Sequence, residues 1–131
     1  MKIKHMESIQ IDTLTNAISE RAQAVSAQAK ELEEAGKYED ARAVLSEFWQ
    51  RIGDRPRLDG LEGAVRAELL LRVGTLSGWL GSARQVPGAQ EIAKDLISES
   101  GALFEKLQLT EKVAETHVDL GICYWREGAL D

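Results

Sequence analysis

The stretch that decides the fold is VAETHVDLGICYWREGALD, Val113 to Asp131. Its small and apolar residues recur at spacings of three and four, the period of one helix face: Ala114, Val118, Gly121, Ile122 and Trp125, flanked by Leu120 and Tyr124. So wide an apolar arc predicts a helix packed between neighbours on two sides. Gly121 predicts a close helix crossing, because an interior glycine costs about 1 kcal/mol relative to alanine. Gly128 is expected to end this helix in a left-handed conformation, with Ala129 to Asp131 opening another.

The composition indicates one soluble, helical domain. The chain has 131 residues, of which 44% are hydrophobic and 29% charged, and only two are prolines. No apolar run approaches the roughly 20 residues that span a bilayer, and no secretory leader is visible. We therefore expect a cytoplasmic protein with no membrane partner. The single cysteine, Cys123, is expected to be a small buried apolar residue.

The charge balance argues against nucleic acid as a partner. A formal net charge of −6 repels phosphate backbones. Five arginines gather in the middle of the chain, where they could contact an acidic peptide; the favoured interpretation is that they are ordinary solvated residues of helix faces. They are Arg55, Arg57, Arg66, Arg72 and Arg84.

The ends of the chain carry two expectations. Residues Met1 to Met6, MKIKHM, do not match the rest of the chain and resemble a leader left by cloning, so the predicted domain covers residues 7–131. The sequence stops just inside a new helical pattern. We therefore expect it to be a fragment of a longer protein.

The first half of the chain predicts an antiparallel pair of helices. A helical pattern runs from Ser8 to Ala35 and Gly36 stops it, while Glu39 and Asp40 place negative charge in the first turn of a second helix. The link between the two is short, as in a helical hairpin. The second helix is expected to bury Ala41, Val44, Leu45, Phe48 and Ile52.

Turn residues divide the second half. The run Gly53 to Gly60 contains Pro56 and is expected to be a loop, and Pro87-Gly88 marks a second break. Two interior glycines of the third helix predict a close helix contact at Gly74 and a stop near Gly81. About five helices are expected, the first with an N-terminal extension; the third and fourth cover Leu61 to Ser82 and Ala89 to Leu107.

Small residues recur at nearly equal spacing at Ala29, Gly74 and Gly121. Helical hairpins that repeat in this way must stack to bury their apolar faces, which predicts an α-solenoid of antiparallel hairpins. The chain resembles the tetratricopeptide repeat family at matching positions of its three units. These are Ala29, Gly36, Tyr38 and Ala41; Gly74 and Ala93; and Gly121, Tyr124 and Gly128, with Leu130 where an aromatic residue is usual.

The spacing exceeds the roughly 34 residues of the ordinary repeat. The chain is therefore similar to extended repeats of bacterial signalling and regulatory proteins, and a different array of helical hairpins stays open.

The resemblance implies a concave groove, formed by the first helix of each unit, that binds a peptide or a partner helix. The expected contacts are Lys30, Glu68, Leu71, Thr75, Trp79, Val118, Ile122, Trp125 and Arg126, with Gln23, Ser26, Glu33 and Glu115 beside them. Leu71, Trp79 and Val118 would give an apolar floor suited to an amphipathic helix. In the alternative, Ile9 to Ile18 or a further helix beyond Asp131 covers these residues.

The residues favour binding over catalysis. Neither a metal-ligand motif nor a phosphate loop nor a nucleophile motif is present, and His117 stands alone on its helix, with His5 in the leader. No cofactor is expected. The leading hypothesis is a non-catalytic protein–protein interaction module of a larger regulatory or signalling protein.

Two alternatives stay open. One is a sensory domain that binds a small molecule or a signal peptide and controls an attached effector domain. The other is an oligomerisation scaffold, a homodimer formed through Leu120, Tyr124 and Trp125 of the C-terminal helix.

Overall fold

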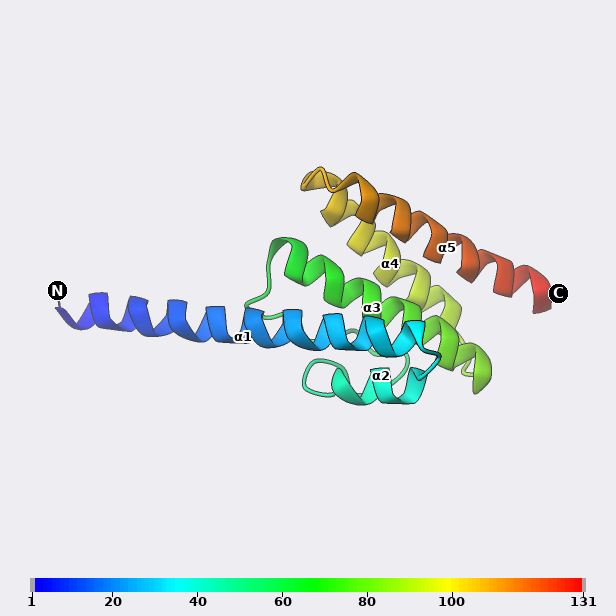
Figure 1. Cartoon of the computed structure of the whole chain (residues 1–131), viewed down its shortest axis with the longest axis horizontal. Helices are drawn as coiled ribbons and strands as arrows, with labels where there is room; N and C mark the ends of the chain where they lie inside the picture. The colour runs from blue at the N-terminus through cyan, green and yellow to red at the C-terminus, as the bar shows by residue number, and fades with distance from the viewer. Residues whose placement is uncertain (1, 131) are drawn as a thin grey trace.

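The computed structural model describes the backbone of residues 2–130 and the side chains of residues 14 and 16–128. Within residues 2–130 the chain forms five helices and no strand, which confirms the predicted all-helical class. The helices are α1 (Lys2–Glu34), α2 (Tyr38–Val44), α3 (Gly63–Ala83), α4 (Ala89–Lys106) and α5 (Thr110–Leu130) (Figure 1). The side chains of the expected cloning leader Met1–Met6, of most of Ile9–Ile18 and of Leu130 lie outside the described residues.

Successive helices run in opposite directions, and α1, α3 and α5 run the same way (Figure 1). The central helix, α3, packs against all four others, whereas α2 packs on α1 and α3, and α4 packs on α3 and α5. A helix with neighbours all round must be apolar all round. The residues of α3 from Leu69 to Gly78 are all buried, and most of them are apolar; the polar exceptions are Arg72, Thr75 and Ser77.

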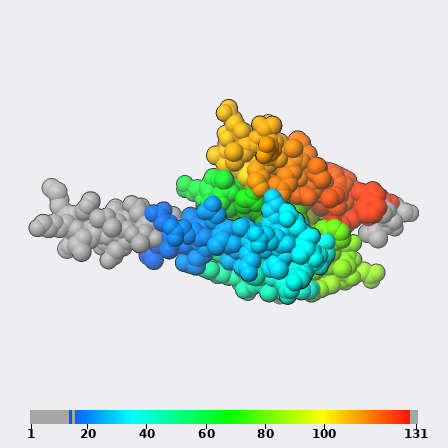
Figure 2. Space-filling model, viewed as in Figure 1, coloured from blue at the N-terminus to red at the C-terminus, as the bar shows by residue number. Residues whose placement is uncertain are grey.

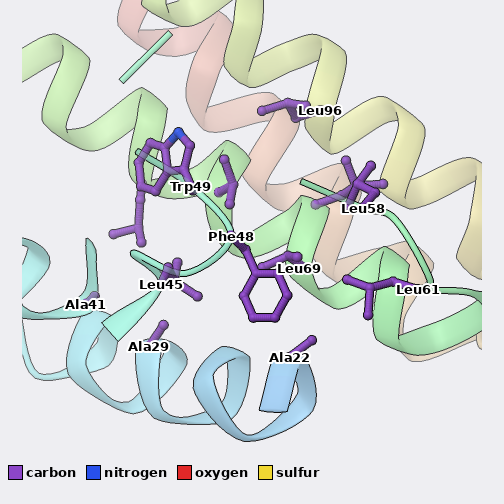
Figure 3. Close-up of a cluster of buried hydrophobic side chains, with 13 residues drawn as sticks. Ala22, Ala29, Ala41, Leu45, Phe48, Trp49, Leu58, Leu61, Leu69 and Leu96 are labelled. Carbon is purple, nitrogen blue, oxygen red and sulfur yellow. The ribbon is translucent and has the colours of Figure 1, made fainter. Parts of the chain in front are cut away.

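Two clusters of buried side chains hold the helices together. The first core lies between α1, α2, the segment 45–62 and α3, with Leu96 contributed by α4. Figure 3 shows Phe48 and Trp49 of that segment among residues of α1, α2 and α3. The second core lies between α3, α4 and α5, and is made of Ala67, Leu71, Ala93, Ile97, Phe104 and Cys123. The buried position of Cys123 confirms its expected place among apolar residues, and burial raises the pKa of its thiol.

The second helix is shorter than the sequence predicts. After Val44 the N–H groups of Leu45, Ser46 and Phe48 each donate to the carbonyl three residues back, and this tighter turning ends α2. The Arg57 N–H then donates to the carbonyl of Phe48 as the segment folds back. The turn brings Trp49 into the first core, where it is almost fully buried.

Three helices end with the same backbone motif. At the end of α1, the N–H of Lys37 donates to the carbonyl of Leu32, and Gly36 takes the left-handed conformation. The helix stop predicted at Gly36 is confirmed. The ends of α3 and α4 repeat these bonds with Gln85 and Gln108 in the left-handed position, at φ of 55° and 58°. Glycine marked the first of these ends in the sequence, and the two glutamines gave no such signal.

Interior glycines bring α3 close to α4. A Cβ placed on Gly74 would lie 2.8 Å from Cγ1 of Ile97, which confirms the predicted contact, and one on Gly81 would meet Cβ of Ala89. The corresponding prediction for Gly121 is wrong, because no described atom comes within 4 Å of a Cβ placed there. The prediction for Gly128 is also wrong. It lies inside α5, which continues to Leu130, so no new helix opens at Ala129.

Candidate functional site

The site expected from the sequence lies where α1, α3 and α5 meet, with α3 between the other two (Figure 1). The C-terminal half of α1 and the body of α5 come together over α3 in the space-filling view (Figure 2). A direct ion pair joins them there, with Lys30 Nζ 3.3 Å from Glu115 Oε1. The expected groove is therefore crossed by charged side chains at its centre.

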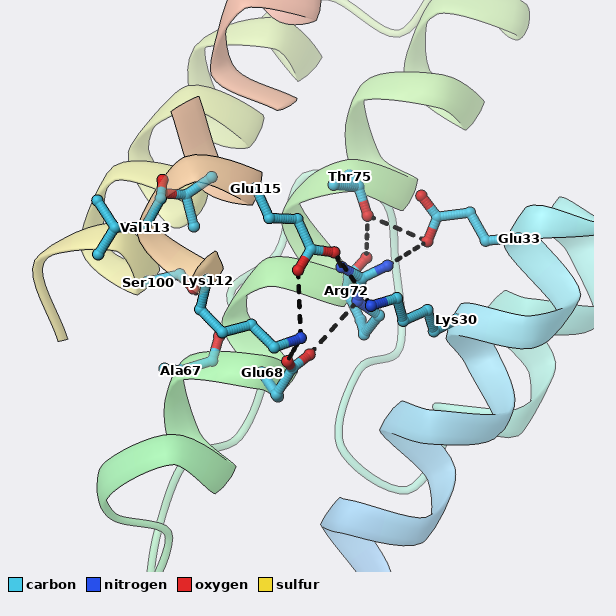
Figure 4. Close-up of polar contacts among 11 residues, drawn as sticks. Lys30, Glu33, Ala67, Glu68, Arg72, Thr75, Ser100, Lys112, Val113 and Glu115 are labelled. Carbon is cyan, nitrogen blue, oxygen red and sulfur yellow. Dashed lines mark hydrogen bonds and ion pairs between the residues drawn. The ribbon is translucent and has the colours of Figure 1, made fainter. Parts of the chain in front are cut away.

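These charges form a network around Arg72, whose side chain is only 4% exposed. Its Nη1 donates to Glu33 Oε2 of α1 at 2.9 Å, and its Nη2 donates to Glu115 Oε1 of α5 at 3.0 Å (Figure 4). Lys112 of α5 pairs with both Glu115 and Glu68. We call these six residues, Lys30, Glu33, Glu68, Arg72, Lys112 and Glu115, the charge network.

Two of the three acids of the network, Glu33 and Glu115, respond differently to their surroundings. Burial raises the pKa of Glu33, and the nearby Arg72 and Thr75 offset only part of this effect. Burial acts in the same direction on Glu115, but Arg72, Lys112 and Lys30 together bring its pKa below the usual value. Glu115 is thus the acid at which the three cations converge.

A pocket of about 280 Å³ lies at one end of the network, beside the first turns of α3 and α5. Its lining is apolar at Ala27, Ala64 and Val65 and polar elsewhere; the polar residues are Gln23, Ser26, Lys30, Glu68 and Lys112. Its volume is close to the lower end of small-molecule sites, about 300 Å³.

A second accessible feature is a row of apolar side chains on α5. Val118 and Trp125 are 63% and 72% exposed, and Ile122 lies between them at 36%. Their spacing of four and three residues places them on one helix face. We call Val118, Ile122 and Trp125 the α5 strip; Gly121 is exposed beside them.

Trp79 of α3 lies next to the strip and shares a small cavity lining with Ile122. Its ring stacks on Tyr38 with centroids 4.9 Å apart, and the guanidinium carbon of Arg126 lies 4.4 Å from its centroid. These contacts fix Trp79 in place while leaving 41% of the residue exposed.

Asp119 lines the same cavity. Burial raises the pKa of its carboxyl to about 6; Arg72 opposes this shift, while Glu33 and Glu115 add to it. Every cation of the charge network is paired with a network acid, but no ion pair to Asp119 is found within the described part of the chain.

The structure separates the residues that the sequence placed in one groove. Val118, Ile122, Trp125 and Trp79 are accessible, whereas Lys30 and Glu68 belong to the charge network. Leu71 was expected in the groove floor, which is wrong: it is fully buried in the second core, because its side of α3 faces α4 and α5. Two further groove residues are buried, Thr75 donating to Glu33 and Arg126 lying against Trp79.

Sequence reasoning missed the importance of Arg72 and Asp119. The interpretation of Arg72 as a solvated residue is wrong, since it is buried, although Arg55 and Arg84 are exposed as expected. An available signal was the apolar sequence on both sides of Arg72, RAELLLRVGTLSGWL, in which a charge must be buried and therefore paired.

Among the described residues, no group of His, Cys, Asp or Glu side chains could hold a metal ion. In the same part of the chain, no helix has the length and apolar character needed to cross a membrane. His117 is exposed, and His5 lies outside the described side chains.

Comparison with known proteins identifies no relative. No protein-family model, curated protein or solved structure matches the chain. The resemblance to tetratricopeptide repeats therefore stays a prediction from the sequence.

Proposed function

We propose that the protein is a non-catalytic interaction module that binds a peptide or a helix of a partner protein along the α5 strip. The observation that carries this proposal is the exposure of Val118, Ile122 and Trp125 in one row. Apolar side chains exposed together on a surface mark interaction sites, and tryptophan is enriched among residues that dominate binding energy. The spacing of the row matches the anchors of a docked amphipathic helix.

The arrangement of the helices supports an α-solenoid as the scaffold. Antiparallel neighbours, two adjoining cores and contacts between α1 and α3 and between α3 and α5 are the features of stacked hairpins. In such a scaffold α1, α3 and α5 form one layer, and a larger regulatory or signalling protein would use that layer for recognition. The charge network then keeps the layer rigid instead of contacting the partner.

A selection experiment tests this function. Random peptides displayed on phage are selected on the immobilised wild-type protein, and the recovered peptides are then measured against variants. Trp125→Ala should weaken binding by about 2 kcal/mol, roughly 30-fold, as expected of a central anchor. Leu14→Ala removes another exposed apolar side chain, on α1, and should leave the affinity unchanged.

The melting temperature of Trp125→Ala should also stay close to that of the wild type, because Trp125 is largely exposed. Peptides that bind both variants as tightly as the wild type would show that the α5 strip is not the binding surface.

The pocket beside the charge network supports a second candidate, a regulatory domain that binds a small molecule. A ligand there would contact α1, α3 and α5 at once, because Gln23, Val65 and Lys112 all line the pocket. Ala64→Leu should fill part of this space. A small-molecule library screened by thermal shift should give stabilising compounds on the wild type that lose their effect on this variant, and a library without such compounds would remove the candidate.

A further inference from the structure

Some charged side chains beside the α5 strip have an ion-pair partner within the described chain, and one does not. Lys30, Arg72 and Lys112 are each bound to acids of the charge network, at distances such as 2.9 Å from Arg72 Nη1 to Glu33 Oε2. Asp119 precedes Ile122 by one helical turn and directly follows Val118, so its carboxylate borders the strip. No cation of the described chain is within ion-pair distance of it.

Lys112 precedes Asp119 on α5 by seven residues and is paired with Glu68 and Glu115, which leaves Arg126 to be considered. Arg126 follows Asp119 by seven residues, which is about two helical turns or 10 Å along the axis. Its guanidinium lies over the ring of Trp79 and is largely buried there. Arg126 and Asp119 line the same small cavity, but no ion pair joins these two described residues.

We propose that Asp119 receives the basic group of the partner, so that the peptide bound along the α5 strip carries a lysine or arginine next to its apolar anchors. The inference rests on the proposed function and names the chemistry of its ligand. An apolar segment that covers Val118 and Ile122 would remove water from around Asp119. A charge that loses its water must be paired, so a segment that brings a cation is favoured over a neutral one.

The electrostatics of the site agree with an external cation. Burial and the carboxylates of Glu33 and Glu115 make ionised Asp119 costly in the free protein, as its pKa of about 6 indicates. Among the described residues, Arg72 and Lys30 offset part of this cost without making an ion pair to Asp119, and a partner ammonium or guanidinium would offset the rest. The net charge of −6 also attracts a cationic segment from a distance.

The test compares selections from one phage-displayed library of random peptides on three proteins: the wild type, Asp119→Asn and Asp95→Asn. Asp95 is an exposed acid of α4, and its substitution removes the same charge from a different surface. Peptides from the wild type and from Asp95→Asn should be enriched in lysine or arginine beside apolar residues. This enrichment should disappear on Asp119→Asn.

A synthetic peptide from the wild-type selection completes the test. Replacing its basic residue with norleucine should lower the affinity for the wild type by about tenfold and leave the affinity for Asp119→Asn unchanged. The inference is wrong if the selected peptides lack the basic residue, or if that residue contributes equally to the affinity for the wild type and for Asp119→Asn. Neither result would contradict binding at the α5 strip.

Two other outcomes overturn the proposed function as well as the inference. One is that no selected peptide depends on Trp125. The other is a second copy of the chain as the occupant: light scattering would then show a dimer that Trp125→Glu converts to a monomer.

Discussion

Single charged residues of this protein differ chiefly in whether the chain itself supplies their partner. Glu115 is approached by Arg72, Lys30 and Lys112, and its pKa lies below the usual value although it is half-buried. Asp119, one turn further along α5, has its pKa raised to about 6. An acidic side chain thus stabilises the fold at position 115 and destabilises it at position 119.

Asp119→Asn is expected to stabilise the protein above pH 6. The folded-state pKa of about 6 exceeds the ordinary value of 3.8. Protonated Asp119 therefore contributes its full stabilisation of the fold below pH 3.8, and this stabilisation is lost as the pH rises through 6. Asparagine resembles the protonated form at every pH. Melting curves should show the variant above the wild type in neutral buffer, with a gap that closes towards pH 3.8.

The matched variant Asp95→Asn should show no such gap, because Asp95 is exposed. A gap for Asp119→Asn that stays constant with pH would mean that ionisation of this carboxyl is not its cause.

At the scale of single helices, the ends and the crossings decide stability. Gly36, Gln85 and Gln108 occupy the same left-handed position after α1, α3 and α4. Glycine adopts this conformation without steric cost because it has no Cβ, whereas the Cβ of other residues crowds the backbone there. The two glutamines are thus sites where the sequence is not optimal for its backbone.

Gln108→Gly should raise the free energy of unfolding by about 1 kcal/mol. The change relieves the left-handed residue at φ 58° and leaves the hydrogen bond from Leu109 to Phe104 intact. Urea denaturation is the measurement. The reverse change, Gly36→Gln, is the control and should lower the free energy of unfolding by a similar amount. If both variants shift the free energy of unfolding in the same direction, the prediction is wrong.

Two interior glycines give a second contrast between helices. Gly74→Ala should destabilise the protein by about 1–2 kcal/mol, because its Cβ would lie 2.8 Å from Ile97 Cγ1 and the overpacking outweighs the better helix propensity of alanine. Gly121→Ala should stabilise it by up to about 1 kcal/mol, since the new methyl group enters open space. Thermal unfolding of both variants measures the effect. If both substitutions change the stability in the same direction, the α3–α4 contact at Gly74 is not tight.

For the whole molecule, the charge network fixes how α1, α3 and α5 lie relative to one another. Arg72 reaches Glu33 on one side and Glu115 on the other from the middle helix. A buried ion pair stabilises little by itself, but its loss is costly when one partner is left behind without its counter-charge. The network therefore specifies one packing of the three helices.

Arg72→Met should destabilise the protein by about 3–5 kcal/mol, because Glu33 and Glu115 lose the cation between them. Adding Glu33→Gln and Glu115→Gln should restore part of this loss. Chemical denaturation measures both variants. Arg21→Met removes an exposed pair with Glu47 and should change stability little, so a similar loss in both single variants would contradict the role of the network.

The sequence was informative wherever local rules govern structure. Its periodicity predicted the helical class, and Gly36 and Pro87-Gly88 predicted two of the breaks. It failed at α2, because the early end of this helix depends on the burial of Trp49 and on a hydrogen bond from Arg57, contacts that no local pattern shows.

The sequence by itself thus determined that the chain is helical, that Gly36 and Pro87-Gly88 interrupt the helices, and that α5 carries Val118, Ile122 and Trp125 on one face. Tertiary structure alone decided that Leu71 faces inward, that Gly121 faces open space and that Asp119 is left without a partner among the described residues. The reason is physical: periodicity fixes which side chains share a face, but packing between distant segments decides which face is covered.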